Sequence, residues 1–144
     1  MHVWTMEPKI RRLILNYSIK SAVVSVVAHP VPAVDEILII PVHYWFSMKM
    51  ARAHDAQILD LPWRQVHTII WGGAAARFCS DVAFSLVPVA GLFAHALTAI
   101  ALTEFLGQYL HEALRKPGSP PPVTIQIVKD SLLRRVKTAS PKAS

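Results

Sequence analysis

The stretch His29-Pro30-Val31-Pro32-Ala33-Val34-Asp35 divides the first part of the chain into two helices. Proline lacks a backbone N–H and disfavours helical geometry in the residue before it, so no helix should continue through this stretch. Apolar residues recur at helical spacing before it, and we predict a helix over residues 8–28. A second helix is predicted over residues 33–55, because its first turn is acidic and its last turn basic, as the helix dipole favours. Pro41 lies inside this second helix and should kink it.

A second corner, Leu86-Val87-Pro88-Val89-Ala90-Gly91, divides the next part of the chain in the same way. Asp60-Leu61-Pro62 should open the helix before it, with Asp60 or a neighbour as the cap and Pro62 in the first turn. That helix should end near Phe84, and a fourth helix should run from the corner to about Leu114.

Sliding the chain so that Pro32 falls on Pro88 indicates an internal repeat of helix, Val-Pro corner and helix. The shift aligns these further pairs: Leu13 with Ile69, Ile14 with Ile70, Leu15 with Trp71, Val26 with Val82 and Val31 with Val87. The alternative interpretation is chance, because apolar helices match one another easily.

We therefore predict an all-α fold in which two similar helical hairpins form a four-helix bundle. Residues 1–116 form the duplicated domain, with hairpins over about 8–57 and 60–115, and residues 117–144 form a proline-rich linker and a basic tail. The tail contains a short amphipathic helix over 124–137, with a short strand near its start as the alternative. Its basic residues are Lys129, Arg134, Arg135 and Lys137.

The composition indicates a surface that is partly apolar. Of the 144 residues, 53% are hydrophobic and 17% charged, against about 25% charged in an ordinary soluble domain. The net charge of +6 is concentrated in the tail, since residues 117–144 carry five Lys/Arg and one Asp/Glu. Part of the surface should therefore face lipid or a partner protein, and the tail should favour anionic partners.

Three arrangements fit the apolar stretches: hairpins inserted partway into one leaflet with the corners deepest, a soluble bundle with an apolar partner-binding face, and full transmembrane hairpins. The longest uncharged stretch, Val82–Thr103, is long enough to span a bilayer, but Pro88 and Gly91 interrupt it. Basic residues flank the apolar block on both sides, which predicts that both ends lie on the cytoplasmic side. Trp45, Tyr44, Trp63 and Trp71 are candidates for the lipid–water boundary or, alternatively, for core packing.

Residues 72–81 contain the candidate helix-packing and interaction positions. Small residues four apart, such as Gly72 and Ala76, let two helix backbones approach closely, and Gly73 belongs to the same patch. Arg77 and Asp81 are spaced to form an ion pair along one helix face. Together with Pro32 and Pro88, these are the predicted packing and interaction residues.

No motif in the sequence indicates catalysis or a bound metal. Ser-His-Asp arrangements, glycine-rich phosphate loops and paired carboxylates are missing, and the seven histidines lack metal-ligand spacing. Cys79 should be an inert packed thiol. His95 lies in an apolar stretch and is expected to be a hydrogen-bonded core histidine, with haem or chlorin ligation as the alternative. We expect no enzyme activity and no cofactor.

The pattern around His29-Pro30-Val31-Pro32-Ala33-Val34-Asp35 resembles the uncharacterised helical domain of YcjF-type inner-membrane proteins, which also occurs at the C-terminus of some small bacterial GTPases. In that family a small-residue helix leads to a proline-marked turn, an acidic residue and a second apolar helix. Residues 85–107 resemble the family's second hairpin, and the resemblance covers about residues 10–114. It implies membrane association on the cytoplasmic side of a bacterial inner membrane, with no assigned catalysis and no functional residues to carry over.

The leading hypothesis is a non-enzymatic scaffold or accessory subunit that docks on a membrane or a membrane-protein complex. The second is a soluble adaptor for a protein partner such as a GTPase, and the third is a small cofactor-holding subunit that uses His95 or His43. Nucleic-acid binding by the tail is disfavoured because its basic residues lack interleaved aromatics. The sequence leaves the oligomeric state open.

Overall fold

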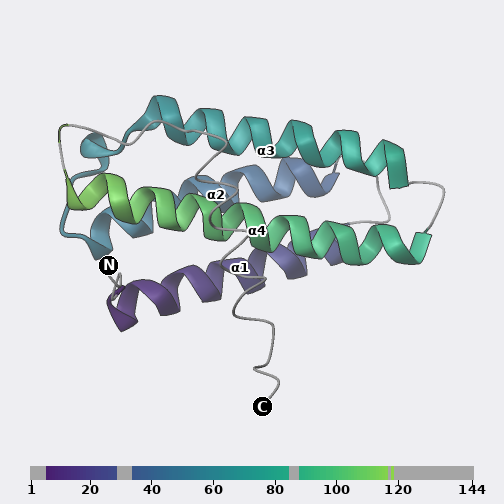
Figure 1. Cartoon of the computed structure of the whole chain (residues 1–144), viewed down its shortest axis with the longest axis horizontal. Helices are drawn as coiled ribbons and strands as arrows, with labels where there is room; N and C mark the ends of the chain where they lie inside the picture. The colour runs from purple at the N-terminus through teal and green to yellow at the C-terminus, as the bar shows by residue number, and fades with distance from the viewer. Residues whose placement is uncertain (1–5, 29–33, 85–87, 117, 119–144) are drawn as a thin grey trace, which may run out of the picture.

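Four long helices that alternate in direction form a bundle in a computed structural model of the chain (Figure 1). The structure describes residues 6–28, 34–84, 88–116 and 118. The elements are α1 (Pro8–Ala28), α2 (Val34–Ala53), the short 3-10 helix η1 (Ile58–Asp60), α3 (Trp63–Phe84) and α4 (Pro88–Arg115). The predicted all-α helical bundle is confirmed, and the helix bounds agree closely with those expected from the sequence.

The helix ends that flank the two predicted corners lie at the same end of the bundle, opposite η1 (Figure 1). Residues 29–33, which include Pro32, and residues 85–87 lie outside the described residues. Pro88 is the first residue of α4, and Pro41 lies inside α2, which is continuous through it. The predicted tail helix and its alternative strand, with Lys129, Arg134, Arg135 and Lys137, also lie outside the described residues.

The connection between α2 and α3 is held by backbone hydrogen bonds and one carboxylate. Asp55 adopts a positive φ of 53°, and the Ala56 amide donates to the Ala51 carbonyl, which ends α2. Asp60 or a neighbour was expected to cap α3. The Asp60 carboxylate accepts the Gln57 amide at 2.9 Å and so closes the η1 turn.

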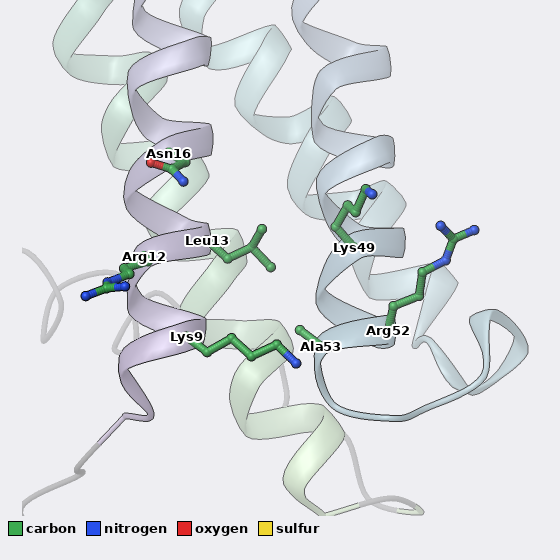
Figure 2. A pocket seen from close by; sticks show the side chains of 7 residues that line it. All are labelled: Lys9, Arg12, Leu13, Asn16, Lys49, Arg52 and Ala53. Carbon is green, nitrogen blue, oxygen red and sulfur yellow. The ribbon is translucent and has the colours of Figure 1, made fainter.

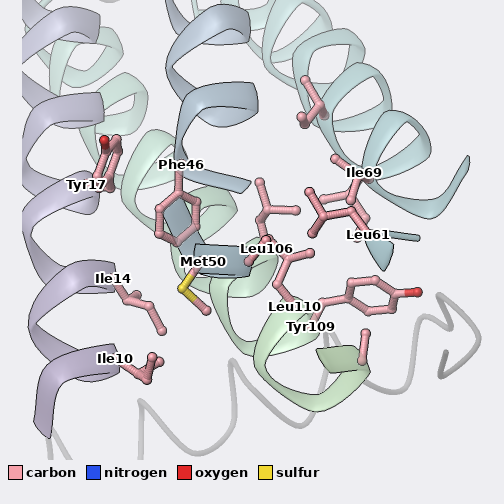
Figure 3. Packing of buried hydrophobic residues seen from close by; sticks show 14 residues of the cluster. Ile10, Ile14, Tyr17, Phe46, Met50, Leu61, Ile69, Leu106, Tyr109 and Leu110 are labelled. Atoms are coloured by element: carbon pink, nitrogen blue, oxygen red, sulfur yellow. The ribbon is translucent and has the colours of Figure 1, made fainter. Parts of the chain in front are cut away.

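The apolar core occupies the half of the bundle that contains η1, the N-terminal part of α1 and the C-terminal part of α4 (Figure 3). Its fully buried members include Phe46, Met50, Leu106 and Leu110. Two glycines allow helices to approach closely. A Cβ on Gly107 would lie 2.7 Å from Ile14 Cγ1, and a Cβ on Gly73 would lie 2.5 Å from Leu102 Cδ1. α1 therefore packs tightly on α4, and α3 packs tightly on α4.

The bundle divides along its axis into two halves of opposite character. We call residues 21–28, 34–45, 74–84 and 88–103 the corner half, and residues 6–20, 46–73 and 104–116 the terminal half. Every buried residue of the core cluster lies in the terminal half, including all those labelled in Figure 3. The corner half contains almost none of this core.

Two of the pairs that the predicted repeat aligns match in exposure. Ile14 and Ile70 are both buried, while Leu15 and Trp71 are both more than half exposed. The two hairpins thus present matched faces at these positions, although the repeat itself stays a prediction. Within the described residues, none of the helices has both the length and the hydropathy needed to cross a bilayer.

Candidate functional site

The interior of the corner half is polar. All four helices contribute buried polar side chains to it, which lie where a soluble bundle would have leucines and valines. Ile39 is the one large aliphatic side chain that is buried among the described side chains of this half. The buried polar residues are Ser21, Ser25, Asp35, Glu36, His43, Arg77, His95 and Thr103.

Arg77 on α3 is the centre of this interior, and its side chain is 2% exposed. Its Nη2 lies 3.0 Å from Asp35 Oδ2, and its Nε lies 2.7 Å from Glu36 Oε1. The same Nη2 donates to Ser25 Oγ on α1 at 2.9 Å. One guanidinium therefore joins α1, α2 and α3 through charge-assisted hydrogen bonds.

The carboxylates opposite Arg77 are placed by the start of α2. Asp35 Oδ1 accepts the Glu36 amide at 2.9 Å, so this carboxylate also satisfies a free N–H of the first turn. The positive end of the helix dipole favours negative charge at this position. His95 on α4 completes the cluster, with Nδ1 3.5 Å from Asp35 Oδ2. We call Ser25, Asp35, Glu36, Arg77 and His95 the ionic cluster.

A second polar layer lies next to the ionic cluster, toward the terminal half. Thr103 Oγ1 lies 3.0 Å from both His43 Nε2 and Ser21 Oγ, and 2.8 Å from the Ala99 carbonyl oxygen. Burial first, and the positive charge of Arg77 second, lower the pKa of His43 from 6.5 to about 4. His43 is therefore neutral at pH 7, and its Nε2 shares a hydrogen bond with the Thr103 hydroxyl.

The exterior of the corner half is apolar. Each helix presents large hydrophobic side chains outward. Among the side chains of this half that the structure describes, which do not include that of Asp81, the fully charged ones are Asp35, Glu36 and Arg77, and all three point inward. The exposed apolar side chains of this half are Val23, Val26, Val27, Val34, Ile37, Leu38, Trp45, Phe78, Val82, Phe93 and Leu97.

Aromatic side chains gather where the two halves meet. Trp45 and Trp71 are both more than half exposed, and the Trp71 indole N–H donates to the Tyr44 hydroxyl at 3.2 Å. The Tyr44 hydroxyl also contacts His67 Nδ1. Trp63 is half-buried and donates to the Ile58 carbonyl at 3.0 Å. Trp45 and Trp71 thus face outward, whereas Trp63 belongs to the packed end of the bundle.

The ends of α2 and α4 meet through two histidines that sequence reasoning had not paired. His54 Nε2 and His111 Nδ1 lie 3.1 Å apart. Burial lowers the pKa of both imidazoles, and their proximity lowers that of His111 further. Among the described residues, no group of three or more His, Cys, Asp and Glu side chains is placed to hold a metal ion.

The contacts that residues 72–81 make differ from the predicted ones. Gly72 and Ala76 face outward, and nothing lies within 4 Å of a Cβ built on Gly72, so the close helix contact belongs to Gly73. Arg77 pairs with Asp35 and Glu36 of α2, and the side chain of its expected partner Asp81 lies outside the described ones.

Cys79 was expected to be packed, but it is exposed. The expectation of a buried histidine at position 95 is met, since His95 is 6% exposed. Its neighbour is a carboxylate of α2 rather than an apolar surface.

The sequence did not lead to the prediction that these polar residues meet in one buried interior. Asp35 and Glu36 are the only charged residues between Lys20 and Lys49. Two carboxylates that stand alone in a long apolar stretch indicate burial, and a buried charge needs a partner of opposite charge. Ser18, Ser21 and Ser25 recur at helical spacing and mark the inward face of α1. These signals show which residues point inward, but they do not identify which helix supplies the opposite charge.

The ionic cluster is closed to solvent and its charges are used in pairing, so the geometry gives it a structural role in holding the four helices. No protein-family model, curated protein or solved structure matches the chain.

Replacing Arg77 with Met should lower the free energy of unfolding by about 3–5 kcal/mol, because two buried carboxylates lose their counter-charge. Chemical denaturation followed by circular dichroism measures this loss. Arg64→Met, an exposed position on the same helix, is the matched control and should change stability by less than about 0.5 kcal/mol.

The triple variant Asp35→Asn, Glu36→Gln, Arg77→Met tests whether the loss comes from unpaired charge. It should recover much of the stability lost in Arg77→Met, because no buried charge is left uncompensated. A triple variant that is less stable than Arg77→Met would contradict the assigned pairing.

Acidification should destabilise the fold through His43. The unfolded chain binds a proton at this position below pH 6.5, whereas the folded chain binds it only near pH 4, so stability falls as pH drops through this window. The loss should reach about 2 kcal/mol at pH 5, measured by urea unfolding at pH 7.5 and pH 5. His43→Gln should flatten part of this dependence, and an unchanged slope would show that His43 does not cause it.

Proposed function

We propose that this protein is a non-enzymatic, membrane-associated scaffold or accessory subunit whose corner half inserts into one leaflet of a bilayer. The observation that carries the proposal is the partition within that half: charged and polar side chains point inward and large apolar side chains point outward. A surface of this kind favours lipid, since every exposed apolar side chain gains by leaving water.

The length of the corner half supports insertion into a single leaflet. At about 1.5 Å of rise per residue, its helical segments are about 12–24 Å long. Half of a typical hydrocarbon core is about 15 Å thick, whereas crossing the whole core takes about 20 apolar residues per helix. Insertion with both corners deepest would bury the apolar surface and keep the terminal half in the aqueous phase.

Residues at the junction of the two halves suit a lipid–water boundary. Trp45 and Trp71 are exposed there, and tryptophan and tyrosine are enriched at this level of membrane proteins. Lys49 Nζ lies 6.0 Å from the ring centre of Trp45, one helical turn further toward the terminal half. The terminal half carries nine Lys/Arg and five Asp/Glu within the sequence, which favours the cytoplasmic face.

The ionic cluster is compatible with a lipid environment because its charges are paired inside the bundle. Intramembrane ionisable residues face the interior of a bundle and pair with one another. Arg77, Asp35 and Glu36 do this, and the apolar shell separates them from the exterior. The shell would then serve as the docking surface, on lipid or on the apolar helices of a membrane-protein complex.

The single cysteine provides a direct test of insertion. A polarity-sensitive fluorophore on Cys79, which is exposed in the corner half, should shift to the blue and become protected from an aqueous quencher when phosphatidylcholine vesicles are added. The matched control carries Cys79→Ser and Gln108→Cys, which moves the label to an exposed position of the terminal half. Its label should stay quenchable.

Three results of the labelling experiment are informative. A response from position 79 alone supports insertion by the corner half. No response from either position, together with a soluble monomer, overturns the membrane proposal and favours a soluble adaptor. An equal response from both positions would place the whole bundle at the lipid surface and contradict selective insertion.

A charge on the apolar surface should weaken vesicle binding. Phe93→Lys places a cation on a corner-half residue that is 67% exposed, and it should reduce vesicle co-flotation on the order of tenfold because an intramembrane Lys costs a few kcal/mol. Leu15→Lys, at a terminal-half residue that is 54% exposed, should leave co-flotation nearly unchanged. Equal losses in the two variants would argue against the assigned surface.

A further inference from the structure

A basic groove lies between α1 and α2 in the terminal half (Figure 2). Its volume is about 530 Å³. Four cationic side chains line it, together with one amide and two apolar side chains. These lining residues are Lys9, Arg12, Leu13 and Asn16 of α1, and Lys49, Arg52 and Ala53 of α2.

The charged residues that line the groove are all positive. No carboxylate is among the lining residues, and within the described part of the chain Lys9, Arg12, Lys49 and Arg52 form no ion pair. Four like charges around one concavity repel one another, so the groove has a strong electrostatic preference for a polyanion. Arginine and lysine donors together with the Asn16 amide match the oxygens of a phosphate group.

The groove begins where the apolar surface ends. Lys49 contributes to its lining and also approaches the ring of Trp45 at the junction of the two halves. With the corner half in a leaflet, the groove would open at the level of the headgroups. Leu13 and Ala53 give it an apolar floor that suits the glycerol end of a lipid.

We infer that this groove binds the phosphate of an anionic phospholipid headgroup, an assignment that rests on the proposed membrane association. Lys9, which reaches across toward α2 (Figure 2), and Lys49 hold the phosphate from opposite helices, and Arg12 and Arg52 add attraction from the rim of the groove. Binding would therefore clamp α1 to α2 at the membrane surface and make attachment depend on lipid charge.

The test compares two variants that each lose two positive charges. Lys9→Gln, Lys49→Gln removes one groove cation from each helix, whereas Arg11→Gln, Arg64→Gln removes exposed cations that do not line the groove. Both are measured by co-flotation with phosphatidylcholine vesicles that contain a minor fraction of phosphatidic acid. The groove variant should bind more weakly than the control variant on the order of tenfold, since a charge-assisted hydrogen bond is worth about that factor.

Equal losses in the two variants would overturn the inference, because they would show diffuse attraction without a site. Inorganic phosphate, added at matched ionic strength without vesicles, separates the two sources of phosphate. If it raises the melting temperature of wild type as much as the phosphatidic acid vesicles do, and fails to do so in the groove variant, the ligand is free phosphate and the lipid assignment is wrong. A stabilisation by vesicles alone supports the lipid.

Pure phosphatidylcholine vesicles distinguish this inference from the proposed function. The groove variant with a label on Cys79 should still insert into them. Insertion without a groove-dependent preference for phosphatidic acid would remove the headgroup site and leave the membrane proposal intact. A preference for phosphatidic acid that depends on the groove, without insertion of the label, would support the headgroup site and contradict the proposed insertion.

Discussion

The guanidinium of Arg77 and the carboxylates of Asp35 and Glu36 impose the constraint on which the corner half depends. A buried charge costs several kcal/mol unless it is paired with good geometry, so these groups must meet if the half is to fold. Ser25 and His95 extend the cluster to α1 and α4. Such a cluster is satisfied in only one rotation of each helix about its axis, and it therefore sets the helix register in a region with little apolar packing.

The inward face changes character along each helix. On α1 it reads Ile10, Ile14 and Tyr17 and then, toward the corner, Ser18, Ser21 and Ser25. The outward face changes in the opposite sense, from charged to apolar. Over a whole helix the inward and outward faces therefore have similar average hydrophobicity. This explains why the sequence looks broadly hydrophobic rather than amphipathic.

The helix bounds could be predicted from the sequence because they depend on local chemistry. Prolines stop or start helices, and acidic first turns and basic last turns mark helix ends, all within a few residues. The four helices and their order follow from these signals, as does the bundle that buries their apolar faces.

The contacts of residues 72–81 could not be predicted, because they depend on how α3 is rotated against its neighbours. Neighbouring residues on a helix point about 100° apart, so assigning the close approach to Gly72 instead of Gly73 places it on the wrong face. Local spacing pairs Arg77 with Asp81, but the carboxylates that bind it come from α2, about forty positions away. The same rotation leaves Cys79 exposed.

In water, the side-chain arrangement of the corner half would have two unfavourable terms in its free energy. The first is the exposure of apolar side chains, and the second is the desolvation of the buried charges. Lipid removes the first cost without adding to the second, because the charges already pair inside the bundle. The depth of the proposed insertion is then determined by the level at which the inward face changes from apolar to polar. On α1 this change falls between Tyr17 and Ser18, and on α2 it falls between Phe46 and His43. Trp45 lies at this level and the basic groove opens just beyond it, so the proposed lipid boundary and the proposed headgroup site would both follow from the same change in side-chain pattern.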